Sequence, residues 1–151
     1  MRTAAHKDRE REALARLEAS GFRMTPQRAH VYRVLLEKRD HPTAEDVFIR
    51  SKRAMPDISM ATVYNCLDAL VQSQLVRLVS HDRGATRYCP NMKPHHHFYC
   101  DRCGGAYDID EHAGLRLPDL DIPAGFHPER YEIVVRGLCP DCAVREAGVR
   151  A

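Results

Sequence analysis

Two Cys-x-x-Cys motifs constrain what this 151-residue chain can fold into more than any other feature of its sequence. They are CDRC at Cys100–Cys103 and CPDC at Cys139–Cys142. Four thiolates in close pairs match a tetrahedral structural zinc site, whereas a thioredoxin-like redox role would need only one pair. We therefore expect a structural Zn2+ with the ligands Cys100, Cys103, Cys139 and Cys142.

The segment between the two motifs is longer than that of a simple zinc ribbon. It contains the β-prone runs AYDID at 106–110 and RYEIVVRG at 130–137, and Pro140 can start a last helix. The sequence therefore predicts a small αβ domain around the zinc. Small domains often need a metal ion to reach useful stability, and a structural zinc would provide that stability here.

Composition limits the class of protein. The chain is 44% hydrophobic and 29% charged, which is typical of a soluble globular protein of one medium domain or two small ones. No apolar run approaches the roughly 18 residues of a membrane span, and the polar N-terminus resembles neither a signal peptide nor a lipidation signal. We expect a cytoplasmic protein that does not associate with membranes.

The N-terminal half carries a pattern of four short helices followed by a hairpin. Apolar periodicity predicts helices over 9–19, 25–37, 43–53 and 59–72, with Thr25, Thr43 and Ser59 as N-caps. Two β-prone runs around Asp82-Arg83-Gly84 follow. Helices and a small hairpin in this order are typical of a winged helix-turn-helix.

In this interpretation 59–72 is the DNA recognition helix. Ser59, Thr62, Tyr64 and Asn65 would contact phosphates and base edges, and Arg23 would add positive charge. The half up to residue 80 has more basic than acidic residues, unlike the rest. The same helical pattern also occurs in protein-interaction domains. The helices alone therefore leave two hypotheses open, DNA binding and protein binding.

Three consecutive histidines precede the first zinc motif. On a strand, His95 and His97 would face one side and His96 the other. Asp108 would lie on the strand that returns beside them. A second metal with His95, His97 and Asp108 is thus plausible, the alternative being a solvated polyhistidine stretch.

Taken together, these segments resemble the Fur (ferric uptake regulator) family of bacterial repressors. The motifs MTPQR, HPTAEDVF, SMATVYNCLDAL, HHHFYCDRC and GLCPDC follow the family in order, from about Ala13 to Cys142. The resemblance implies an α+β fold with a winged-helix DNA-binding domain at 1–88, a hinge at 89–94 and a metal-binding dimerisation domain at 95–151. It also implies a homodimer that binds an A/T-rich palindromic operator in double-stranded DNA.

The resemblance further implies a regulatory metal site. Carried over by motif, its ligands are His41, Cys89, His95, His97 and Asp108. HPTA, Asn65 in ATVYN and aspartate at 108 are most similar to the peroxide-sensing branch of the family. In that branch Fe2+ (or Mn2+) occupies the site, and peroxide oxidises a ligating histidine, here His41 or His95, so that the repressor loses its metal and leaves DNA.

Cys89 departs from that branch, which normally has a carboxylate at this position. Oxygen and nitrogen ligands suit Fe2+ and Mn2+, whereas a thiolate favours Zn2+. Zinc sensing and iron sensing therefore remain alternatives, and Cys89 could also be an oxidisable thiol or a bystander. A further metal site of some relatives would involve His96, Glu111 and Glu129, but Leu115 falls near an expected carboxylate.

Two functions of other classes compete with the repressor. A metallohydrolase could use the histidines, but the chain has no His-Glu-x-x-His motif and its helical half would be unexplained, so we expect no enzyme. A metal-storage or delivery protein would not need His41 for metal affinity.

Overall fold

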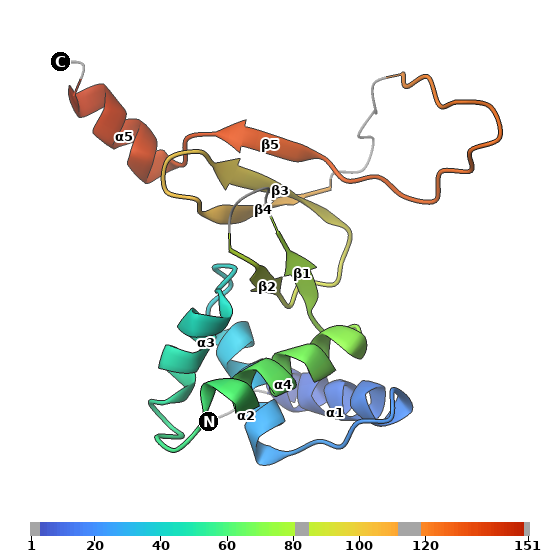
Figure 1. The fold of residues 1–151 in the computed structure, drawn as a ribbon, viewed down its shortest axis with the longest axis vertical. Coiled ribbons are helices and arrows are strands. Elements are labelled where there is room, and N and C mark those ends of the chain that lie inside the picture. Colours follow the sequence, from blue (N-terminus) through green and yellow to red (C-terminus); the bar gives the residue numbers. More distant parts are fainter. Residues whose placement is uncertain (1–3, 81–84, 112–118, 150–151) are drawn as a thin grey trace. The chain divides into compact units, whose positions relative to one another are not determined.

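The computed structural model describes residues 4–80, 85–111 and 119–149. The chain divides into two compact units, Met1–Met92 and Lys93–Ala151 (Figure 1). No helix of the described ranges has the length and apolar character needed to cross a membrane.

The first unit contains four helices and a two-stranded sheet. Its elements are α1 (Ala4–Ala19), α2 (Pro26–Glu37), α3 (Ala44–Ser51), α4 (Met60–Gln72), β1 (Arg77–Val79) and β2 (Arg87–Cys89). The strands β1 and β2 are antiparallel, with Leu78 opposite Tyr88. The predicted hairpin strands are thus present, while the turn Asp82-Arg83-Gly84 lies outside the described residues.

The three predicted N-caps are confirmed. Thr25 Oγ1 accepts from the backbone N–H of Arg28 at 3.1 Å, and Ser59 Oγ accepts from that of Thr62 at 3.1 Å. Thr43 forms a complete capping box with Asp46. Since each cap satisfies backbone donors at a helix start, local sequence fixes where α2, α3 and α4 begin.

The first helix is longer than predicted. It begins at Ala4 rather than near residue 9, because residues before the apolar positions can extend a helix without contributing to its buried stripe. Its predicted end at residue 19 is confirmed, and Gly21, whose φ of +84° is left-handed, follows two residues later. Phe22 N–H donates to Leu17 O and Gly21 N–H to Glu18 O, which is a Schellman motif.

The core of the first unit lies between the helices. Its fully buried aliphatic side chains include Leu17, Val31, Leu35, Val47, Val63, Leu67 and Leu70. Val63, Leu67 and Leu70 lie on one face of α4, so the opposite face of this helix is left for other contacts.

The second unit is a three-stranded sheet followed by a helix. Its elements are β3 (His95–Cys100), β4 (Ala106–Asp110), β5 (Val134–Gly137) and α5 (Pro140–Val149). The strand β3 is central, antiparallel to β4 and parallel to β5. The predicted α+β class is confirmed, but β5 is shorter than the expected 130–137, because Tyr131 packs on His96 instead of joining the ladder.

The second unit has little ordinary hydrophobic core. Its buried cluster consists of Cys100, Cys139 and Cys142, with Phe98 packed against it. Its other buried side chains include the three consecutive histidines. Most of the buried side chains of this unit are therefore histidines and cysteines, residue types that commonly bind metals.

Candidate metal centres

Four cysteine sulfur atoms of the second unit lie within 4.8 Å of one another. Cys100 ends β3, Cys103 follows in the turn, Cys139 precedes α5 and Cys142 lies in its first turn. Cys103 Sγ and Cys139 Sγ are 3.8 Å apart. Thiolates about 2.3 Å from a tetrahedral zinc ion would be about 3.8 Å apart, so this donor set fits Zn2+.

Hydrogen bonds from backbone amides lower the pKa of two of these cysteines, Cys100 and Cys139. Hydrogen bonds from backbone N–H groups, Cys103 first, lower the pKa of Cys100 to about 6, while burial raises the pKa of Cys142 to about 12. The pKa of Cys139 is lowered by the N–H of Cys142 and by the hydroxyl of Tyr107. The four sulfurs therefore cannot all ionise at neutral pH without a cation among them.

Tyr107 is a neighbour of the cysteine cluster that the sequence did not reveal. A Cβ at Gly105 would lie 3.0 Å from Tyr107 Oη and 3.3 Å from Cys103 Sγ, so the hydroxyl adjoins the cluster and glycine makes room for it. A hydrogen bond to a thiolate spreads its charge and makes it a poorer target for protons and oxidants.

We expect Tyr107→Phe to accelerate transfer of Zn2+ to a chromogenic chelator by roughly fivefold, because it removes one partly exposed charge-assisted hydrogen bond. The matched control is Tyr131→Phe, since Tyr107 and Tyr131 are each 43% exposed and Tyr131 Oη donates to Glu111 Oε1 rather than to sulfur. Equal transfer rates in both variants and the parent protein would contradict this role.

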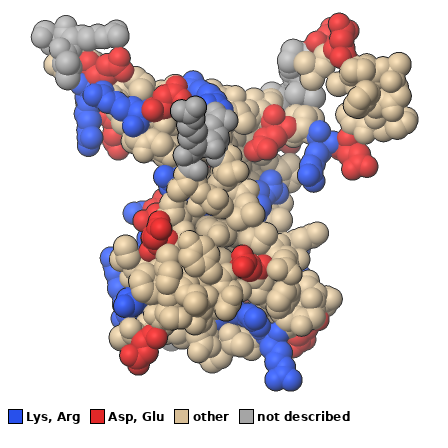
Figure 2. Space-filling view, in the orientation of Figure 1, with Lys and Arg blue, Asp and Glu red and all other residues tan. Residues whose placement is uncertain are grey.

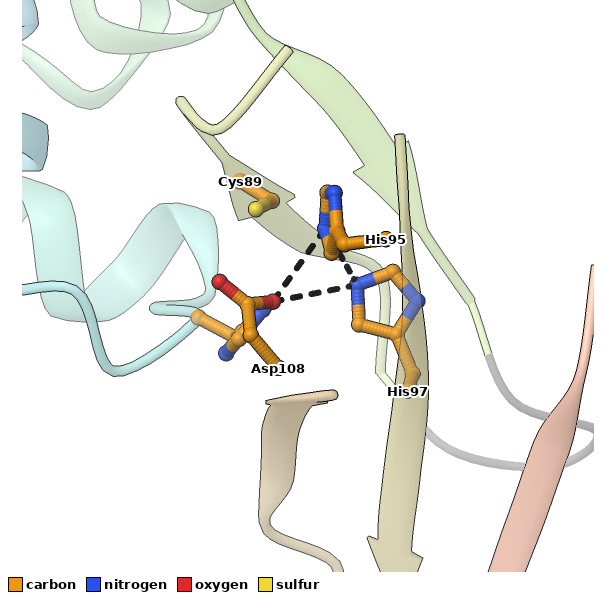
Figure 3. A group of neighbouring side chains, drawn as sticks. Cys89, His95, His97 and Asp108 are labelled. Atoms are coloured by element: carbon orange, nitrogen blue, oxygen red, sulfur yellow. Dashed lines mark hydrogen bonds and ion pairs between the residues drawn. The ribbon is translucent and has the colours of Figure 1, made fainter. Parts of the chain in front are cut away.

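A second cluster of donor atoms lies on the sheet of the second unit. His95 Nε2 is 3.1 Å from His97 Nε2, and Asp108 Oδ1 is 3.2 Å and 3.4 Å from these two atoms (Figure 3). The ladder pairs His97 with Asp108, which places the carboxylate beside the imidazoles. Donors about 2.1 Å from one metal would be about 3.0 Å apart in an octahedron and 3.4 Å in a tetrahedron.

The other ring nitrogen of each imidazole, Nδ1, lies close to an oxygen atom that can accept a hydrogen bond. His95 Nδ1 lies 2.6 Å from the carbonyl oxygen of Lys93, and His97 Nδ1 lies 3.2 Å from Glu132 Oε1. Since these oxygens only accept, both Nδ1 atoms carry a hydrogen, and the Nε2 atom of each ring is the one that faces Asp108 and can act as a metal ligand. Three acceptor atoms this close repel one another unless a cation or proton lies among them, which fits a divalent ion.

Within the first unit, His41 and Cys89 are two possible metal ligands that lie close together. A ring nitrogen of His41 and Cys89 Sγ lie within 4.8 Å of each other, and the residues are 3% and 2% exposed. Arg87 Nη1, two residues before Cys89 on β2, donates to the carbonyl oxygen of His41 at 2.9 Å. Strand β2 thus carries both the cysteine and an anchor for the histidine.

The residues proposed for a further metal site make other contacts. His96 Nδ1 accepts from the N–H of Ile133 at 3.0 Å, and the ring stacks on Tyr131 with centroids 5.6 Å apart. Glu111 accepts from Tyr131, and Glu129 is exposed. Within the described ranges these three do not form a third ligand cluster beside the two above, and Leu115 lies outside those ranges.

The expected DNA-contact residues lie at the surface of the first unit. Ser59, Tyr64, Asn65 and Arg23 are exposed and Thr62 is half-buried. On the face drawn in Figure 2, basic and acidic side chains are both present. With a net charge of only +2, DNA affinity would depend on particular contacts of α4 rather than on the overall field.

Comparison with known proteins gives one consistent family. Residues 19–134 match the model of the ferric uptake regulator family. The peroxide operon regulator of Bacillus subtilis is 31% identical over 143 residues, covering 90% of this chain and 94% of the relative. The peroxide-responsive repressor PerR of Staphylococcus epidermidis is 32% identical over 136 residues, covering 87% and 88%.

A solved structure agrees on the fold. The ferric uptake regulator Fur of Helicobacter pylori, described as having three functional metal binding sites, aligns with a TM-score of 0.71 at 16% identity, covering 91% of this chain and 93% of the other. At this identity the agreement concerns the fold alone.

Proposed function

The chain belongs to the ferric uptake regulator family, and we propose that it is a metal-dependent, DNA-binding transcriptional repressor that responds to peroxide. The observation that carries the proposal is the convergence of His95 Nε2, His97 Nε2 and Asp108 Oδ1, in which both imidazoles are buried. The names of the relatives from B. subtilis and S. epidermidis support peroxide as the signal.

DNA is the proposed partner of the first unit. The exposed side chains of Tyr64 and Asn65 on α4 suit base edges, while Ser59, Thr62 and Arg23 suit phosphates. The repressor would act as a homodimer on an A/T-rich palindrome, because a two-fold protein matches a palindromic site. Since its target is the chromosome, the proposal places it in the cytoplasm.

We further propose that one regulatory ion is held by both units. His95, His97 and Asp108 would supply three ligands from the second unit, and His41 and Cys89 two from the first. An ion that needs ligands from both units favours the arrangement that brings them together. Metal occupancy would thereby control the DNA-binding state.

The peroxide response requires a redox-active ion beside a histidine. With Fe2+ bound to activate the peroxide, one oxygen atom of hydrogen peroxide would be added to an adjacent imidazole, His41 or His95, and the other would leave as water. The chain contributes burial, which limits water at the site, and the Lys93 carbonyl and Glu132 carboxylate, which hold the two Nδ1–H groups. An oxidised imidazole is a poorer ligand, so the metal would leave and repression would end.

Zinc sensing is the second candidate, and the burial of Cys89 beside His41 favours it. A thiolate ligand shifts preference toward Zn2+ and away from Fe2+ and Mn2+. We expect Cys89→Asp to lower affinity for Zn2+ relative to Mn2+ by about tenfold or more, measured by competition titration with the cysteine cluster already filled. An unchanged ratio would show that Cys89 is not a ligand.

Metal-dependent DNA binding tests the function itself. A palindromic A/T-rich duplex is selected from a randomised pool, and its affinity is measured with Fe2+, Mn2+ or Zn2+ under anaerobic conditions. The proposal expects saturable binding that needs the second metal and weakens steeply with salt. Hydrolytic turnover without DNA binding would instead indicate a metalloenzyme, and metal affinity unaffected by His41→Ala would indicate storage or delivery.

A further inference from the structure

The loop that carries His41 has an unusual backbone. His41 has a φ of +52°, in the left-handed region, and among the described non-glycine residues only Gln74 shares a positive value. A histidine stays in this conformation only when the surroundings hold it there. The segment between α2 and α3, residues 38–43, is called the His41 loop below.

One side of the His41 loop is fixed by an ion pair. Arg50 of α3 donates from Nη1 to Asp40 Oδ1 at 2.8 Å and from Nη2 to Asp40 Oδ2 at 2.7 Å. These parallel hydrogen bonds fix direction as well as distance, and the two side chains are only 23% and 33% exposed.

The other side of the loop is fixed by strand β2. Arg87 donates to His41 O at 2.9 Å, and Tyr88 N–H donates to Pro42 O at 3.0 Å. Helix α3 therefore holds the loop at Asp40, the residue before His41, and strand β2 holds it at the His41 carbonyl. Of these contacts, the Asp40–Arg50 ion pair can be removed by a conservative substitution without changing β2 or the core.

We propose that the Asp40–Arg50 pair is a positioning device that keeps the His41 imidazole ready to bind the regulatory metal. The inference rests on the proposed function, in which His41 is a ligand. Ligand histidines depend on their supporting contacts, and loss of such a contact typically costs ten- to a hundredfold in metal affinity. In this protein the support acts through the backbone rather than through the ring.

The test uses Asp40→Asn and Arg50→Lys in the full chain with its zinc site filled. We expect each to lower Mn2+ affinity by about tenfold, and the reversed pair Asp40→Arg with Arg50→Asp to recover part of the loss. In protein that holds the structural zinc but no regulatory metal, amides of the His41 loop should exchange with solvent faster while those of α4 do not. Glu12→Gln, which breaks the exposed Arg16–Glu12 pair of the same unit, is the control and should change neither quantity.

The His41→Ala background separates the possible failures. If the pair acts through His41, Asp40→Asn combined with His41→Ala loses no more affinity than His41→Ala alone. An undiminished effect in that background, or unchanged affinity in both single variants, overturns the positioning role alone. If His41→Ala itself leaves Mn2+ affinity unchanged, the proposed ligand set fails and the positioning role falls with it.

Discussion

Removal of zinc is expected to unfold the unit Lys93–Ala151 while the helices of the unit Met1–Met92 stay folded. The buried cluster of the second unit consists largely of cysteines that we expect to bind zinc, so little apolar burial remains without the ion. Structural zinc contributes an apparent binding free energy of about 10–16 kcal/mol, comparable to the whole stability of a small domain, about 5–15 kcal/mol.

Cys142→Ser is the substitution expected to reproduce this loss. Cys142 is 4% exposed, and burial raises the pKa of its thiol to about 12, so it is the ligand that depends most on the cation for its ionisation. Hydrogen exchange should show β3 exchanging like an unfolded chain while α4 remains protected. Zinc content should fall below one ion per chain.

Cys66→Ala is the matched control for a cysteine outside the cluster. Cys66 is 3% exposed in the core of the first unit, so its truncation should cost about 1 kcal/mol of unfolding free energy and leave zinc content unchanged. Protected β3 amides in fully zinc-free protein would contradict the account, because the second unit would then be stable without its metal.

His97→Ala is expected to remove the regulatory metal while the structural zinc remains. His97 is 1% exposed, and its Nε2 lies near both His95 Nε2 and Asp108 Oδ1, so its loss deprives the cluster of a central donor. Mn2+ affinity should fall by more than about a hundredfold, since loss of an outer partner alone costs ten- to a hundredfold. DNA affinity should fall to that of protein that holds only the structural zinc.

The control for His97→Ala is His127→Ala. His127 is an exposed histidine of the same unit and belongs to neither cluster found among the described residues. It should retain Mn2+ binding, measured by competition titration, and metal-dependent DNA binding, measured by fluorescence anisotropy. Full metal-dependent DNA binding by His97→Ala would remove His97 from the regulatory site.

Much of the fold follows from local sequence because its signals are local. Thr25, Thr43 and Ser59 fix helix starts through contacts three residues away, and Gly21 ends α1 through its own backbone conformation. Boundaries without such signals were missed. The predicted α1 begins too late because the first residues of the helix add no position to its apolar stripe, and the predicted β5 begins too early because a tertiary contact of Tyr131 leaves no periodic pattern.

The metal-binding residues could likewise be predicted where the signal is local and not where it depends on packing. Pair spacing indicates the zinc ligands, and strand alternation places His95 and His97 on one face, with Asp108 on the adjoining strand. Their supporting residues could not be found, because the contacts of Glu132 with His97 and of Tyr107 with the cysteine cluster arise only once the strands and turns are packed. The bidentate pair Asp40–Arg50 is likewise a product of how α3 packs beside the His41 loop.

The most direct test of peroxide sensing follows DNA affinity and histidine oxidation in the same sample. Protein is loaded anaerobically with Fe2+, bound to the selected duplex and treated with hydrogen peroxide, and its peptides are then weighed by mass spectrometry. We predict that DNA is released and that peptides containing His41 or His95 gain one oxygen atom in the iron-loaded protein, but not in protein that holds only the structural zinc. Unoxidised histidines, together with DNA binding activated best by Zn2+ and unaffected by peroxide, would contradict it.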